Sequence, residues 1–170
     1  MNYTGNNIQG WKSNAELEWM FEFSKRMNSI AEVGVWKGRG THALCSGCPG
    51  RVTVVDPFDP LQYGHPETKL AGGDVLTQFK ANMAQFQNLR IWPMASEFTP
   101  DDESFDMVFL DGQKAYSDYF RDIARWLPRT RMVIAGYDFR DEEPVGVKSA
   151  VLDTFGPSIN VFENIWYKTL

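Results

Sequence analysis

The sequence has few of the residues on which metal centres, disulfides and nucleic-acid surfaces depend. Its 170 residues include two cysteines and two histidines, and 17 lysines and arginines stand against 22 aspartates and glutamates, for a formal net charge of −5 at pH 7. The basic residues form no block, which argues against a nucleic-acid backbone as the main partner. We therefore expect a small or uncharged molecule as the partner and no binding of nucleic acid.

Long apolar runs are missing as well. No stretch of 18 apolar residues occurs, and the polar, asparagine-rich start is unlike a signal peptide. These absences predict a cytoplasmic protein that does not enter a membrane. There is no internal repeat, low-complexity tract or linker, and 43% hydrophobic residues can fill a sizeable core. We predict a single domain over residues 1–170, in which 1–28 form an N-terminal extension and helix.

The two cysteines form one C-x-x-C motif, Cys45 to Cys48, with His42 three residues earlier. Such a motif suits a redox pair or half of a zinc site. A structural zinc site needs four ligands, however, and the motif begins in a segment that resembles a helix. We interpret Cys45 as a core thiol and Cys48 as a loop thiol.

The most informative stretch that is present is 30–41, an apolar strand that runs into Gly34, Gly38 and Gly40 before a helix begins. Glycine lets the backbone adopt a positive φ and lets a ligand approach without meeting a Cβ. The spacing G-x-x-x-G-x-G fits more than one kind of nucleotide site.

The residues around these glycines favour one kind of nucleotide site. A turn that binds a pyrophosphate requires small neutral residues beside the helix N-terminus. Here Glu32 places a carboxylate near the strand end, and Trp36 places bulk inside the turn. A carboxylate suits a cofactor with an ammonium group, such as S-adenosylmethionine, better than a dinucleotide. We expect Trp36 to border the cofactor.

Apolar periodicity and breaker residues predict alternating strands and helices in the rest of the chain. We expect helices over about 14–28, 40–47, 74–87, 116–127 and 145–155, and strands over 30–33, 51–55, 89–92, 105–110, 132–135, 160–163 and 165–168. The short connection between the last two strands permits only an antiparallel hairpin. The irregular stretch 57–73 is long for a connection in a compact domain, and we predict a lid over the cofactor there.

Acidic residues follow three of the expected strands, at Asp56, Asp111 and Asp138. Ligands of open parallel sheets bind outside the carboxyl ends of the strands, so the three carboxylates should face one crevice. Asp56 is placed to accept hydrogen bonds from two ribose hydroxyls. Ser96, after the strand 89–92, should lie near the adenine.

Four motifs in this order resemble the class I S-adenosylmethionine-dependent methyltransferases, and within them the methyltransferase domain 24 family. They are Glu-Val-Gly-Val-Trp-Lys-Gly-Arg-Gly-Thr at 32–41, Val-Val-Asp-Pro-Phe at 54–58, Phe-Asp-Met-Val-Phe-Leu-Asp-Gly at 105–112 and Ile-Ala-Gly-Tyr-Asp-Phe at 134–139. The resemblance covers the chain from about residue 28 to the end. It implies an α/β fold in three layers, a Rossmann-like, mostly parallel seven-stranded sheet with an antiparallel last strand.

The resemblance also implies a role for individual residues. It assigns Glu32 and Gly34 to the methionine end of the cofactor, and Asp56 to the ribose. Asp111 stands where related O-methyltransferases hold a divalent metal or position the acceptor, and Asp138 stands where they supply a second acidic ligand. The implied cofactor-binding residues are, with Trp36 from the argument above, Glu32, Gly34, Trp36, Gly38, Gly40, Thr41, Asp56, Ser96 and Asp111.

Two positions depart from the family pattern, which commonly has a histidine three residues after the first of these aspartates and another before the second. This chain has Lys114 and Tyr137 there. An unperturbed lysine is protonated at neutral pH, so Lys114 could act as a base only if its pKa were lowered. It could instead hold a substrate anion or be a surface charge.

The expected activity is the methylation of a hydroxyl group on a small or sugar-like molecule. We predict Asp111, Lys114 and Asp138 as catalytic residues, with Asp111 and Asp138 as candidate ligands of Mg²⁺ or another divalent cation. One alternative is a cofactor-binding module without catalysis. A second is a short-chain NAD(P)-dependent oxidoreductase, against which the chain has no Tyr-x-x-x-Lys pair.

Overall fold

The computed structural model describes residues 3, 5–59, 74–140 and 146–170. The predicted lid, 57–73, therefore lies almost entirely outside the described residues. The strands are β1 (Ser29–Val33), β2 (Arg51–Val55), β3 (Leu89–Trp92), β4 (Phe105–Leu110), β5 (Thr130–Gly136), β6 (Asn160–Phe162) and β7 (Ile165–Thr169). The helices are α1 (Asn14–Ser24), α2 (Arg39–Gly47), α4 (Val75–Met83), α5 (Tyr116–Trp126) and α6 (Val147–Phe155), with short 3₁₀ turns η1 (Ser96–Phe98) and η2 (Leu127–Arg129).

The strands form one seven-stranded sheet in the order β3-β2-β1-β4-β5-β7-β6. Strands β1 to β5 are parallel, and β7 runs antiparallel to both of its neighbours, β5 and β6. From β1 the chain adds β2 and β3 toward one edge of the sheet, and it then returns to add β4 and β5 on the other side of β1. The strand order therefore reverses between β1 and β4. The predicted Rossmann-like sheet and its antiparallel end are confirmed, and the reversal places a crevice at the carboxyl ends of β1 and β4.

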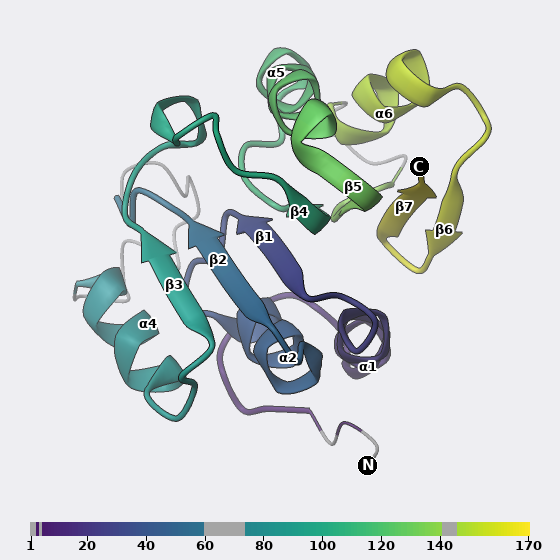
Figure 1. Ribbon diagram of the computed structural model, residues 1–170. Coiled ribbons are helices and arrows are strands. Elements are labelled where there is room, and N and C mark those ends of the chain that lie inside the picture. Colours follow the sequence, from purple (N-terminus) through teal and green to yellow (C-terminus); the bar gives the residue numbers. More distant parts are fainter. Residues whose placement is uncertain (1–2, 4, 60–73, 141–145) are drawn as a thin grey trace.

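Helices cover both faces of this sheet (Figure 1). One core lies between the sheet and α1, α2 and α4, and the other lies between the sheet and α5 and α6. Strand β4 is buried at all six positions, as expected for a central strand with a helix layer on each face. No helix among the described residues is long and apolar enough to cross a membrane.

The predicted helices over 14–28 and 74–87 extend too far at their C-terminal ends. Helix α1 begins at a capping box formed by Ser13 and Glu16 but ends at Ser24, whose hydroxyl donates to the Phe21 carbonyl. The carbonyl of Asn28 accepts a hydrogen bond from the Arg51 amide, which aligns the start of β1 with β2. The chain must leave the helix by this point, so residues 25–28 form the connection. Helix α4 likewise ends at Met83, before residues 84–88 lead into β3.

Candidate active site

A cavity of about 1040 Å³ lies at the carboxyl ends of the parallel strands. Loops that follow β1, β2, β3, β4 and β5 line it, together with Gly10, Trp11 and Lys12 from the segment before α1. A volume near 1,000 Å³ is at the upper end of the range for small-molecule sites. The space therefore suits a nucleoside cofactor together with a small second molecule.

Two glycines of the turn after β1 are required by close packing within the protein itself. A Cβ on Gly34, whose φ is +82°, would lie 2.4 Å from the carbonyl oxygen of Asp111. A Cβ on Gly40 would lie 2.7 Å from Oε1 of Glu32. Both glycines also line the cavity, whereas Gly38 packs against α4 and is not part of the lining. The turn thus places the ends of β1 and β4 against each other.

Asp56, at the end of β2, holds the backbone of this turn. One carboxylate oxygen accepts hydrogen bonds from the amides of Val35 (2.8 Å) and Trp36 (3.1 Å), and the other accepts from the amide of Phe58 (2.7 Å). The side chain lines the cavity although the residue is only 2% exposed. Asp56 therefore shapes the turn directly and faces the space where a ligand would lie.

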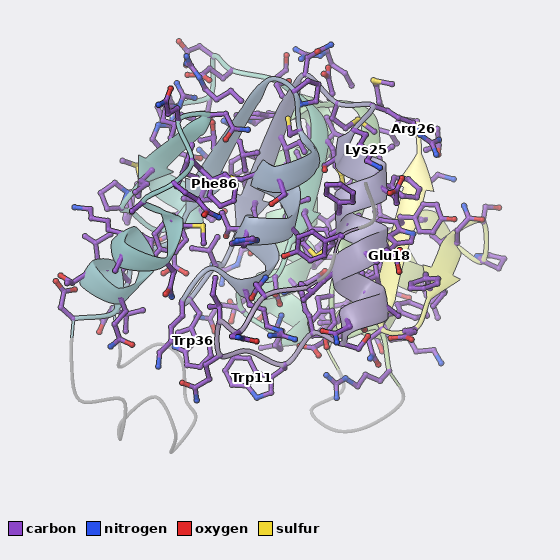
Figure 2. The ribbon with its side chains drawn as sticks, turned by 90° about the horizontal axis from the view of Figure 1, so that it is seen from below. Trp11, Glu18, Lys25, Arg26, Trp36 and Phe86 are labelled. Carbon is purple, nitrogen blue, oxygen red and sulfur yellow. The ribbon has the colours of Figure 1, made fainter. Side chains whose placement is uncertain are left out.

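Trp36 has a strained backbone and a buried indole that borders the cavity. Its φ is +47°, a value that bulky residues rarely adopt. Its ring lies 4.5 Å from the ring of Trp11, measured between centroids. Figure 2 shows the two tryptophans side by side at one end of the molecule, opposite Lys25 and Arg26. Within the described chain, the indole nitrogen of Trp36 is buried without a hydrogen-bond partner.

Glu32 lies behind the turn and does not line the cavity. Glu32 is 1% exposed, and its carboxylate accepts a 2.6 Å hydrogen bond from the hydroxyl of Thr41. Burial raises the pKa of Glu32 to about 7, against the opposing effects of Lys12 and Thr41. Thr41 is fully buried and also lies outside the lining. These two residues therefore support the turn from its protein side.

The raised pKa of Glu32 predicts a stability that depends on pH. A carboxyl group with a raised pKa in the folded state stabilises the fold below its unfolded pKa, and this contribution is lost as pH rises through the folded pKa. The window runs from 4.5 to about 7. Across it, the parent should lose about 3 kcal/mol of unfolding free energy relative to Glu32→Gln.

Urea denaturation of the two proteins at several pH values measures this difference. His42, whose pKa burial lowers, is present in both proteins, so its contribution cancels in the comparison. Parallel stability curves for the parent and Glu32→Gln between pH 4 and 8 would contradict the raised pKa of Glu32.

A row of alternating charges forms the wall of the cavity at the ends of β4 and β5. Asp111 accepts hydrogen bonds from the ammonium groups of both Lys12 and Lys114. The Lys114 nitrogen also lies 3.2 Å from a carboxylate oxygen of Asp138, which in turn pairs with Arg140. The row therefore reads Lys12, Asp111, Lys114, Asp138 and Arg140, and its three cations outnumber its two carboxylates.

Two members of this row, Lys12 and Asp138, have pKa shifts with identifiable causes. Burial alone would lower the pKa of Lys12, but the carboxylates of Asp111 and Glu32 raise it above the usual value, so Lys12 is a permanent cation. Burial alone would raise the pKa of Asp138, but Lys114 and Arg140 hold it below that of a free carboxyl group. Both shifts favour the charged form of the group, a cation at Lys12 and a carboxylate at Asp138.

The comparisons with known proteins agree with this geometry. A family model described as a methyltransferase domain, that of methyltransferase domain 24, matches residues 31–132. These residues include the glycine turn, Asp56, Ser96, Asp111 and Lys114, and they make up more than half of the chain. This protein belongs to the methyltransferase domain 24 family. It is an S-adenosylmethionine-dependent methyltransferase, and the predicted oxidoreductase alternative is therefore set aside.

Solved methyltransferase structures share the fold at low sequence identity. PaMTH1 of Podospora anserina, bound to S-adenosylhomocysteine (SAH), is 16% identical with a TM-score of 0.63, over 92% of this chain and 78% of that one. An O-methyltransferase from Bacillus cereus in complex with SAH is 15% identical with a TM-score of 0.61, over 96% and 85%. The N-methyltransferase NodS of Bradyrhizobium japonicum with SAH is 11% identical with a TM-score of 0.61, over 90% and 83%. No curated protein sequence matches the chain.

The two carboxylates predicted to bind a divalent metal pair with basic side chains in this methyltransferase. Asp111 and Asp138 were expected to hold Mg²⁺ between them, but the ammonium group of Lys114 bridges them, with Lys12 and Arg140 on the outer sides. The described part of the chain contains no group of three or more His, Cys, Asp or Glu residues arranged to hold a metal. A lysine thus supplies the charge between the two carboxylates that a metal would otherwise supply.

Tyr137, in place of the family histidine, has a packing role in the methyltransferase. Its hydroxyl lies 3.3 Å from the carbonyl of Trp11 and 3.3 Å from the carboxylate of Glu16. The Lys12 ammonium lies 4.6 Å from the centre of its ring. Burial raises the pKa of Tyr137 well above its usual value, so the phenol stays neutral. It joins the N-terminal segment to β5 and places Lys12 over the cavity wall.

The sequence analysis missed Lys12 and did not identify Cys48 as buried. Lys12 is 99 positions from Asp111, and its only sequence signal is its place just before the Ser13 capping box. Cys45 is buried as expected. Cys48, at the C-terminal end of α2, is also buried, and its thiol donates a 3.1 Å hydrogen bond to the Met27 carbonyl. Burial raises the pKa of both thiols, which suits two core residues.

Proposed function

We propose that this protein transfers a methyl group from S-adenosylmethionine to a hydroxyl of a small phenolic or sugar-like molecule. The observation that carries the proposal is the charged row at the ends of β4 and β5, which forms one wall of the cavity. S-adenosylmethionine, when bound, supplies a sulfonium methyl group whose carbon takes an oxygen lone pair as its bond to sulfur breaks.

The cofactor would lie along the turn after β1. Asp56 would accept hydrogen bonds from the ribose, as it lies on the cavity wall beside the turn that it holds. Gly34 and Gly40 would lie beneath the methionine end of the cofactor. Trp36 would border the cofactor, and its buried indole N–H has no hydrogen-bond partner among the described residues. Glu32, Gly38 and Thr41 would act from behind the turn.

The acceptor would lie against Asp138 and the ammonium group of Lys114, which bridges Asp138 to Asp111. The ionised carboxylate of Asp138 is placed to accept the hydroxyl proton, and the Lys114 ammonium is placed to donate to the oxygen as negative charge develops on it. The proton then leaves to solvent from the carboxylate. Lys12 would hold the Asp111 carboxylate in position through their ion pair.

A hydroxyl acceptor fits this wall better than a protonated amine. The row carries three cations and two carboxylates, so a cationic acceptor would approach an excess of like charge. An oxygen that becomes negative during the reaction would instead be stabilised by Lys114. This charge balance favours O-methylation, although both O- and N-methyltransferases share the fold.

Calorimetry followed by a turnover assay tests the proposal. The protein should bind S-adenosylhomocysteine and not NADH. It should methylate members of a panel of catechols and glycosides at a rate that neither Mg²⁺ nor EDTA changes, because Lys114 bridges the carboxylates. Methylation of amines but of no hydroxyl compound, or a rate suppressed by EDTA, would contradict it.

A further inference from the structure

Asp122, on α5, presents a carboxylate to the cavity. It lines the cavity together with Ser96, the first residue of η1, which is expected near the adenine. The Ser96 hydroxyl donates a 2.7 Å hydrogen bond to Oδ1 of Asp122 and accepts one of 2.8 Å from the indole of Trp126. A hydroxyl has a single proton, so Ser96 has none left to donate to a ligand.

The second oxygen of this carboxylate faces the end of β4. A Cβ placed on Gly112 would lie 3.5 Å from Oδ2 of Asp122, and Gly112 itself lines the cavity. Because Gly112 has no side chain, nothing from that residue separates Oδ2 from the cavity. Among the described residues, only Ser96 donates a hydrogen bond to Asp122.

Among the described residues, this carboxylate receives one hydrogen bond, at Oδ1. An ionised carboxylate has about four lone-pair positions to satisfy. Burial raises the pKa of Asp122, and the Ser96 hydroxyl opposes that rise. A ligand that brings a neutral N–H donor to Oδ2 would stabilise the ionised form without adding charge to the site.

We propose that Asp122 accepts a hydrogen bond from the exocyclic amino group of the cofactor's adenine and so selects adenosine over its deaminated form. The inference rests on the proposed placement of the cofactor, in which Asp56 holds the ribose and the base lies beside Ser96. An adenine presents an N–H donor at its six position, whereas hypoxanthine presents a carbonyl there. A carbonyl would place its lone pairs against those of the carboxylate.

Binding of S-adenosylhomocysteine and S-inosylhomocysteine tests the proposal without any acceptor. By calorimetry, the parent should bind the adenosyl compound about ten- to a hundredfold more tightly, the usual effect of one hydrogen bond to a charged group. In Asp122→Asn the amide oxygen can still accept from Ser96, while its NH₂ faces the base. This variant should therefore lose affinity for the adenosyl compound and gain affinity for the inosyl compound, which reverses the preference.

A reversed preference cannot come from partial unfolding, because unfolding weakens both ligands. Asp153→Asn is the matched control: Asp153 lies on the neighbouring helix α6 and accepts a hydrogen bond from the exposed Tyr116, so its substitution should leave both affinities unchanged. Equal binding of the two compounds by the parent would overturn the role of Asp122, as would an equal loss of both in Asp122→Asn. If the parent bound neither compound, the cofactor placement would fail and this proposal with it.

Discussion

Methyl transfer should fall roughly 10²- to 10⁴-fold in Asp111→Asn, the range typical of losing a positioned acid-base or electrostatic group. Asp111 accepts from two ammonium groups, those of Lys12 and Lys114. The Lys12 side chain is only 9% exposed. A neutral amide would leave two neighbouring cations without their shared carboxylate, so Lys114 would no longer be held between Asp111 and Asp138.

Initial rates with saturating S-adenosylmethionine, beside calorimetry with S-adenosylhomocysteine, separate catalysis from cofactor binding. Affinity should change far less than the rate. Asp138→Asn should also lose most of the rate, because it removes the proton acceptor while Lys114 still has Asp111. Glu22→Gln is the control, since the Glu22 side chain is 47% exposed, pairs with Lys25 and does not line the cavity. Unchanged turnover in either active-site variant would remove that residue from the mechanism.

Binding of S-adenosylhomocysteine should become undetectable in Asp56→Ala, and the fold should lose about 3 kcal/mol or more of unfolding free energy. The loss of stability follows from three backbone amides, of Val35, Trp36 and Phe58, that donate to this one side chain. Buried donors left without an acceptor cost about 1–3 kcal/mol each. The loss of binding follows because the same amides position the turn.

Asp56→Asn separates these two effects. The amide keeps one acceptor oxygen, so the variant should recover part of the stability, yet its NH₂ group must face either the turn amides or the ligand. Denaturation in urea and calorimetry on both variants check the expectation. A folded Asp56→Ala protein with the parent's affinity would show that Asp56 takes no part in holding the cofactor.

Local sequence patterns were sufficient to predict the strands and the edge of the sheet at which the cavity lies. The run of apolar residues in β4 and the short β6–β7 connection determine a buried parallel strand and an antiparallel end. Parallel strands have their carboxyl ends at one edge, so Asp56, Asp111 and Asp138 had to lie near one crevice. All three line the cavity. Helix ends were predicted less well, because the exit from α1 depends on the pairing of Asn28 with Arg51.

Only the tertiary structure decided what surrounds these carboxylates. Lys12 reaches Asp111 because Tyr137 and Glu16 hold the N-terminal segment against β5. The ammonium groups of Lys12 and Lys114 then pair with Asp111, a residue that was predicted to bind a metal. Periodicity and capping record interactions within a few residues, whereas a contact across 99 positions depends on how whole elements pack. The sequence therefore predicted the acidic residues at the strand ends, whereas the packing of the fold determined which basic side chains pair with them.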